Sequence, residues 1–220
     1  PQVRLRDGIY RDIQKRSAEW MRAIDPERVL HLFRLNANLP TDVKPLGGWE
    51  SEGHVLRGAF GGHYLSICSQ LYEATGDPAF KQRVDVVVAG LDECQRALGE
   101  SGYLCAYPES SFDFAEAGEP GRQGISSVPF YTVHEIMAGL EQAHRRCNSE
   151  LALKVRLGMA RWTAKRTARL AYDHMQQFLN IEHGGMLEML LNLYEETGDK
   201  EFLDTATRFE HKRIFDPLLG

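Results

Sequence analysis

Apolar residues recur at intervals of three and four along most of the chain, which is the spacing that buries one face of an α-helix. The breaks between these stretches carry helix caps and not the turn residues of β-hairpins. The pattern therefore predicts an all-α protein. The expected helices cover residues 8–24, a segment beginning at Asp25-Pro26, and residues 61–76, 77–99, 129–146, 150–172, 184–197 and 199–212.

Two long segments interrupt this periodicity. Residues 38–58 contain Pro40, Pro45, the pair Gly47-Gly48 and Trp49, which would be costly inside a helix. Residues 100–128 are rich in Gly, Pro, Ser and acidic groups but also carry aromatic side chains. Loops of this length are usually functional or disordered, and the aromatic content favours an ordered loop.

An internal repeat organises the helices into hairpins. The sequence LYEATGDPAF at 71–80 returns as LYEETGDKEF at 193–202, and a fainter copy has Cys147-Asn148-Ser149 in place of Thr-Gly-Asp. Each hairpin has an apolar face that it cannot bury alone, so similar hairpins must pack side by side. The sequence predicts a partial α/α-barrel, a toroid of hairpins occupying residues 1–220 as a single domain.

Three hairpins and an N-terminal helical pair are too few to close the six-hairpin ring of this architecture. Two explanations stay open. The chain corresponds to the N-terminal half to two-thirds of a larger barrel, or a second copy covers the open edge by self-association.

Histidines occupy equivalent places in the repeat. The inner helices of a toroid run in the same direction, so their N-terminal ends should converge, and these ends contain His63, His134 and His183. A single histidine is more often structural than functional, but the other five of the eight share no such placement. A neutral imidazole donates and accepts hydrogen bonds, which suits sugar hydroxyls.

Carboxylates and aromatic residues extend this set. Glu182, Glu135 and Glu188 could bind hydroxyls or act as acid or base, or could simply stabilise helix N-termini. Glycosidase chemistry needs two catalytic groups at a defined separation, which the sequence does not give. The candidate stacking residues, for which anchoring of the loops is the alternative, are Trp49, Tyr103 and Tyr107.

Composition narrows the class of protein. The chain is 43% hydrophobic and 26% charged, which is ordinary for a globular protein, and its apolar stretches are too short to span a bilayer. A net charge of −5 argues against nucleic-acid binding. The basic run at 154–169 is interpreted as a solvated helix face. We expect neither a membrane nor a nucleic acid as partner.

The cysteines and the N-terminus give little further chemistry. The four cysteines are widely spaced and form no CxxC pair, which favours reduced, buried thiols over disulfides or a zinc knuckle. They are Cys68, Cys94, Cys105 and Cys147. Residues 1–4 lack an apolar stretch, so no secretory signal is visible. A cytoplasmic location is favoured, and the compartment is otherwise left open.

Four segments together resemble a known family. They are GGWESEGHVLRGAFGGHYLS at 47–66, GYLCAYPESSFD at 102–113, VPFYTVHEIMAGL at 128–140 and IEHGGMLEMLLNLYEETGD at 181–199. These are similar to the β-L-arabinofuranosidase family of glycoside hydrolases, formerly a domain of unknown function. The resemblance runs from about Leu5 to Pro217 and covers the N-terminal part of that family's six-hairpin catalytic domain.

The resemblance implies a retaining exo-glycosidase that acts on β-linked L-arabinofuranose. It also implies a cysteine thiolate nucleophile, a glutamate acid/base, and a zinc ion that activates the thiolate. Those motifs belong to later hairpins of the family, and none of the four cysteines matches them. We therefore assign no catalytic residue and no metal ligand here, expect zinc only in the complete enzyme, and expect no hydrolysis by these 220 residues.

By the same resemblance, His134 and His183 match sugar-binding histidines of the family. The expected substrate-binding set for an arabinose-containing saccharide is His134, His183, Glu182, His63, Tyr131 and Trp49. The sequence departs from the family at Glu135, where lysine is common, at Leu187-Glu188, where Asn-Glu is common, and at Ala59, where histidine is common. These departures leave the fine specificity open.

Two other functions remain open at the level of sequence. One is a non-catalytic carbohydrate-binding or scaffold fragment. The other is a different six-hairpin enzyme, such as a sugar epimerase or a lyase, in which histidines would carry out acid/base chemistry directly.

Overall fold

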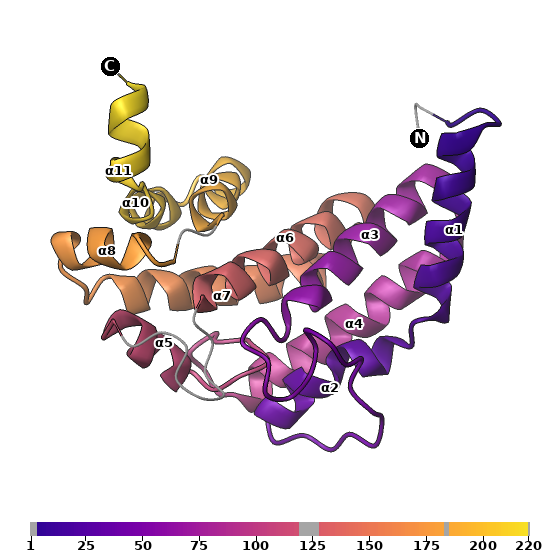
Figure 1. Cartoon of the computed structure of the whole chain (residues 1–220), viewed down its shortest axis with the longest axis horizontal. Helices are drawn as coiled ribbons and strands as arrows, with labels where there is room; N and C mark the ends of the chain where they lie inside the picture. The colour runs from indigo at the N-terminus through magenta and orange to yellow at the C-terminus, as the bar shows by residue number, and fades with distance from the viewer. Residues whose placement is uncertain (1–3, 119–127, 183–184, 220) are drawn as a thin grey trace.

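The structure, a computed structural model, describes residues 4–118, 128–182 and 185–219. Within these ranges its regular secondary structure is helical, apart from one isolated β-bridge between Gly47 and Glu50. It confirms the predicted all-α class (Figure 1). The elements are α1 (Ile9–Ala23), α2 (Pro26–Asn36), α3 (Ala59–Thr75), α4 (Pro78–Ala97), α5 (Ser110–Glu116), α6 (Pro129–Cys147), α7 (Glu150–Thr167), α8 (Tyr172–Leu179), α9 (Met186–Thr197), α10 (Lys200–Arg208), α11 (Lys212–Phe215) and a short 3₁₀ turn (Asp216–Leu218).

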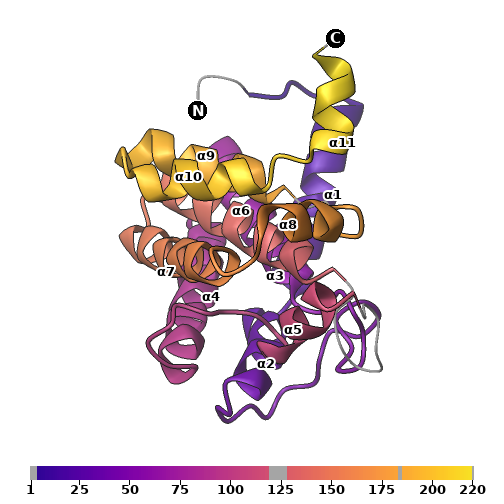
Figure 2. The ribbon, with the colours of Figure 1, turned by 90° about the vertical axis from the view of Figure 1, so that its left-hand side faces the viewer.

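Two layers of helices form an open part of an α/α-barrel. In the inner layer α3 packs on α6 and α6 on α9, while in the outer layer α4 packs on α7 and α7 on α10. Each inner helix pairs with the outer helix that follows it in the sequence, as α9 and α10 do in Figure 2. The three predicted hairpins are therefore confirmed. None of the described helices is long and apolar enough to cross a membrane.

The turn inside each hairpin explains the sequence repeat. The helix ends at a residue in the left-handed conformation, with φ of 73° at Gly76, 54° at Asn148 and 72° at Gly198. Glycine and asparagine are the residues that adopt this conformation most readily. The next residue then caps the following helix with its side-chain oxygen, and these caps are Asp77, Ser149 and Asp199.

The inner helices α3 and α6 are in direct backbone contact. They run in the same direction (Figure 1), and their C-terminal ends are joined by an ion pair between Glu73 and Arg146. A Cβ atom on Gly62 would overlap the carbonyl oxygen of Glu135, and one on Gly139 would lie 2.5 Å from the carbonyl oxygen of Gly62. Two glycines therefore allow the helices to approach each other more closely than larger side chains would permit.

The basic run at 154–169 is a solvated face only in part, because Lys154, Arg161, Lys165 and Arg169 are exposed while the other two arginines are buried. Arg156 has 0% exposure and pairs with Glu141 of α6 and Glu196 of α9, each at 2.9 Å. Arg166 is also buried, and its guanidinium bonds Asp113 and Glu116 of α5. These arginines are buried because carboxylates from neighbouring helices neutralise them.

The larger differences from the sequence prediction concern the helix predicted at 150–172 and the loop predicted at 100–128, and the helix predicted at 199–212 also ends early, at Arg208. The predicted helix at 150–172 ends at Thr167, and α8 follows as a separate helix. Arg208 of α10 donates to the carbonyl oxygens of Thr167 and Leu170, so these helix-end acceptors have partners from another hairpin. Within the predicted loop 100–128, α5 forms against Arg166. Both of the larger differences depend on tertiary partners.

The glycine contact gives a first prediction. Alanine at an ordinary helix position is favoured over glycine, but Gly62→Ala should destabilise the chain by about 3 kcal/mol because its methyl group meets backbone that cannot move aside. Urea unfolding measures the change. Gly53→Ala, where no atom lies within 4 Å of the added carbon, is the control and should change the free energy of unfolding by less than about 0.5 kcal/mol. Equal effects at both positions would contradict the contact.

Candidate functional site

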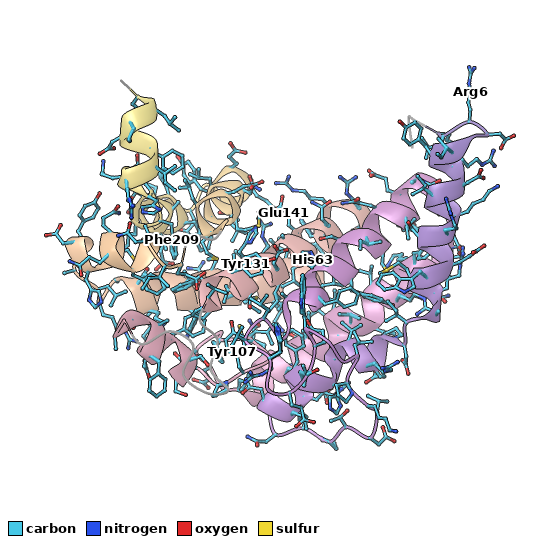
Figure 3. All side chains as sticks on the ribbon, viewed as in Figure 1. Arg6, His63, Tyr107, Tyr131, Glu141 and Phe209 are labelled. Atoms are coloured by element: carbon cyan, nitrogen blue, oxygen red, sulfur yellow. The ribbon has the colours of Figure 1, made fainter. Side chains whose placement is uncertain are left out.

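The N-terminal halves of α3 and α6 meet around one carboxylate. Nδ1 of His63 lies 3.2 Å from Oε2 of Glu135, and Nδ1 of His134 lies 3.7 Å from Oε1 of the same side chain. The first distance allows a hydrogen bond, while the second is a longer electrostatic contact. Figure 3 shows His63 and Tyr131 near the middle of the molecule. Three residues that the repeat placed at helix N-termini therefore lie together.

Tyr131 belongs to the same group. Its ring centroid is 6.2 Å from that of His134. Burial raises the pKa of Tyr131, and the charge of Glu135 and a hydrogen bond to it act in the same direction. Glu135 thus contacts three side chains from two helices, and we call His63, Tyr131, His134 and Glu135 the histidine cluster.

His134 is a neutral imidazole in this environment. Its side chain is 19% exposed, and burial lowers its pKa from 6.5, although the charges of Glu135 and Glu188 act in the opposite direction. The nearby His63 also lowers the pKa. The buried Nδ1 has no hydrogen-bond partner among the described residues. At pH 7 this ring can both donate and accept a hydrogen bond.

The N-terminus of α9 closes against His134. Gly185, which precedes α9, lies so close to the imidazole that a Cβ atom there would overlap the ring. A flanking glycine therefore lets the histidine lie against the backbone of the third inner helix. His183 and Gly184 lie outside the described residues, so the expected role of His183 stays a prediction.

Glu182 is buried and its side chain does not lie where it could bind a sugar directly. It is 1% exposed, and its carboxylate accepts the backbone N–H groups of Phe130 at 3.1 Å and Tyr131 at 2.8 Å. These are orphan donors at the start of α6, where a carboxylate is favourable. Burial raises the pKa of Glu182 to about 8 against the opposing effect of these bonds. In this arrangement Glu182 positions Tyr131 and is not open to a ligand.

Glu50 accepts backbone N–H groups at the start of α3 in the same way that Glu182 accepts them at the start of α6. Its buried carboxylate accepts the N–H groups of Gly58 at 2.8 Å and Phe60 at 2.9 Å, and burial raises its pKa. Sequence reasoning did not select this residue. It lies in the irregular segment 38–58, eight residues before its nearer partner, and no periodic pattern marks it.

The three aromatic candidates separate into two groups. Tyr103 and Tyr107 are 3% and 0% exposed, and the hydroxyl of Tyr107 donates to the carbonyl oxygen of Pro129 at 2.9 Å. They anchor the loop, which was the alternative interpretation. Trp49 is 67% exposed and borders a cavity of about 400 Å³. It lies beside the histidine cluster and not within it.

The described residues do not fit a zinc centre of the kind that the resemblance implies. No group of three or more His, Cys, Asp and Glu side chains among them could hold a metal ion. The four cysteines are buried, and burial raises the pKa of the Cys68, Cys94 and Cys105 thiols to about 12. At neutral pH these thiols are protonated, and no cysteine is grouped with two further ligand side chains among the described residues.

Comparison with known proteins identifies the family. A family model described as the catalytic domain of GH127 β-L-arabinofuranosidases matches residues 2–219. The chain belongs to this family. The earlier resemblance is thereby confirmed, together with the assignment to a family of glycoside hydrolases. A search of curated proteins found no match.

Solved structures of GH127 proteins have the same fold. Ara127N-Se, a GH127 β-L-arabinofuranosidase from Geobacillus stearothermophilus T6, superposes with a TM-score of 0.67 at 17% identity, covering 94% of this chain and 32% of that one. The GH127 β-arabinofuranosidase BT3674 gives a TM-score of 0.60 at 16% identity, covering 91% and 32%. The chain therefore spans about a third of the length of each.

The cluster geometry predicts how His134 titrates. Glu135→Gln removes the nearest negative charge, so the pKa of His134 should fall further below 6.5. An NMR pH titration of the imidazole resonances measures the change. Glu150→Gln is the matched control, because Glu150 is 84% exposed and faces His144 at 3.9 Å. A pKa of His134 that is unaffected by Glu135→Gln would contradict the arrangement.

The burial of Glu182 predicts a pH dependence of stability. Its pKa rises from 4.5 in the unfolded chain to about 8 in the folded one, so the folded state binds the proton more tightly. The stabilisation that this tighter proton binding gives the folded state is complete below pH 4.5 and is lost as the pH rises through 8. Relative to that of Glu182→Gln, which does not titrate at this position, the free energy of unfolding of the wild type should fall by on the order of a few kcal/mol between pH 4.5 and 8. Urea unfolding at several pH values tests this, and a constant difference would contradict it.

Proposed function

We propose that this chain provides the sugar-binding part of a GH127 glycoside hydrolase and that the histidine cluster binds the terminal arabinose of a saccharide. The observation that carries the proposal is the convergence of His63, His134 and Tyr131 on Glu135. Its support from the comparisons is membership of a β-L-arabinofuranosidase family.

The chemistry of the cluster suits a polyol. Neutral imidazole, phenol and carboxylate together offer donors and acceptors at fixed positions, as the hydroxyl groups of a furanose require. The groups are partly buried, so their bonds to a sugar compete less with water than surface groups do. Gly62 and Gly185 remove the side chains that would otherwise separate the three helix ends.

Binding without turnover is the activity proposed for the chain itself. A cysteine nucleophile needs an accessible thiolate, and the four thiols here are buried and protonated. Glu182 is bonded to backbone and is closed off from a substrate. In the complete enzyme, we assign the zinc ion, the nucleophile and the acid/base to residues other than these.

Calorimetry tests the sugar site. L-Arabinose and a β-linked L-arabinofuranose disaccharide should bind the wild-type chain, and His134→Ala should weaken both by at least about tenfold because a buried hydrogen-bonding group is lost. His174→Ala is the control, since His174 lies on α8 and bonds the carbonyl oxygen of Glu116. Release of arabinose from the disaccharide by the purified chain would contradict binding without turnover, and equal affinities of the two variants would contradict the site.

A further inference from the structure

A second feature lies beside the histidine cluster and is not used by it. A cavity of about 400 Å³ opens between the C-terminal half of α1, the turn at 47–50 and the first turn of α3. Trp20, Trp49 and Phe60 line it, together with the polar residues Arg28 and Glu50. We call this cavity the aromatic cleft.

The backbone of Trp49 is held in a tight turn, while the residue itself is exposed. It follows Gly47 and Gly48, which have φ of 86° and 59°, in a turn closed by a 3.0 Å bond from the Glu50 N–H to the Gly47 carbonyl oxygen. The carboxylate of Glu50 is in turn bonded to the start of α3. The backbone turn therefore fixes where the Trp49 side chain begins, and the residue is 67% exposed.

Trp20 is fixed from the opposite side of the cleft. It is 57% exposed, and its ring meets that of Phe60 edge to face at a centroid distance of 6.1 Å and an interplanar angle of 74°. Phe60 packs in turn on the buried Tyr64 at 6.2 Å. The cleft thus presents two largely uncovered indoles, one of which, that of Trp20, packs on Phe60.

Such a site is suited to a small ligand with apolar faces and polar edges. Preformed cavities of a few hundred cubic ångström with aromatic walls and a few polar groups are typical ligand sites. Indole rings pack well on flat C–H surfaces, and Arg28 adds a polar group to the wall, while the carboxylate of Glu50 is bonded to backbone beneath it. A saccharide ring has both kinds of surface.

The aromatic cleft adjoins the histidine cluster. Phe60 precedes His63 by one turn of α3, so both side chains lie along the same side of that helix. His63 is also close enough for its charge to lower the pKa of Glu50, against the larger effect of burial. A ligand longer than one sugar could therefore reach both sites.

We propose that the aromatic cleft binds the second sugar of an arabinose-containing oligosaccharide whose terminal sugar occupies the histidine cluster. The proposal rests on the proposed function and assigns Trp20 and Trp49 to recognition of the adjoining residue. According to this proposal the affinity depends on the number of sugars in the ligand, because a monosaccharide in the histidine cluster does not reach the indoles.

Calorimetry with ligands of two lengths tests the proposal. The wild-type chain should bind a β-linked L-arabinofuranose disaccharide about tenfold more tightly than L-arabinose. Trp49→Ala and Trp20→Ala should each reduce this ratio severalfold and leave the affinity for L-arabinose unchanged. Tyr10→Ala is the matched control, because Tyr10 is an exposed aromatic residue of α1 that does not line the cleft. Circular dichroism checks that each variant is folded.

The outcomes separate this proposal from the proposed function. If L-arabinose binds but the disaccharide binds no more tightly, or if Trp49→Ala leaves the ratio unchanged, the cleft proposal is overturned and the histidine cluster stands. If neither sugar binds, both are overturned. If only the disaccharide binds and Trp49→Ala removes that binding, the cleft is supported and the histidine cluster is not. Sedimentation on the same samples shows whether the tryptophans instead hold two copies together, which would overturn a sugar site.

Discussion

The contact between Gly62 and the backbone of α6 sets the geometry on which the rest of the site depends. Helices with ordinary side chains at their interface pack with axes about 8–10 Å apart. Here a side chain at Gly62 or Gly139 would collide with the opposing backbone, so the two inner helices approach more closely than that arrangement allows. This approach brings the imidazole of His63 within 3.2 Å of a carboxylate on the next helix.

Carboxylates at the amino ends of the inner helices have two distinct roles. Glu50 and Glu182 are buried, bond backbone N–H groups and have raised pKa values because of burial. Glu135 lies within α6 and turns toward side chains instead. Only their partners distinguish the two carboxylates that bond backbone from the one that contacts side chains.

Much of the fold could be predicted because it depends on local sequence. Left-handed residues such as Asn148 and capping residues such as Ser149 act within a few positions, so the hairpin turns can be identified without tertiary information. The end of α7 and the formation of α5 could not be predicted. They depend on Arg208 and Arg166, whose partners lie 38 to 57 residues away in the sequence. The same reason explains why the burial of Arg156 and Arg166 within the basic run was not predicted.

The candidate site shows the same division. The repeat placed His63 and His134 at equivalent helix ends, and the structure brings them to one carboxylate. Glu182 was selected because it precedes His183, but adjacency in the sequence does not reveal that its side chain points to the start of α6. Glu50 was missed because a loop residue with a backbone partner has no periodic signal.

The bonds of Glu182 also affect the order in which successive hairpins can form during synthesis. Glu50 reaches its helix across eight to ten positions, whereas Glu182 closes the start of α6 from 51 and 52 residues further along the chain. Synthesis proceeds from the N-terminus at roughly 5–20 residues per second. A nascent chain that ends before this carboxylate therefore leaves the beginning of α6 without two of its acceptors, and the second hairpin matures only after the entrance to the third has emerged.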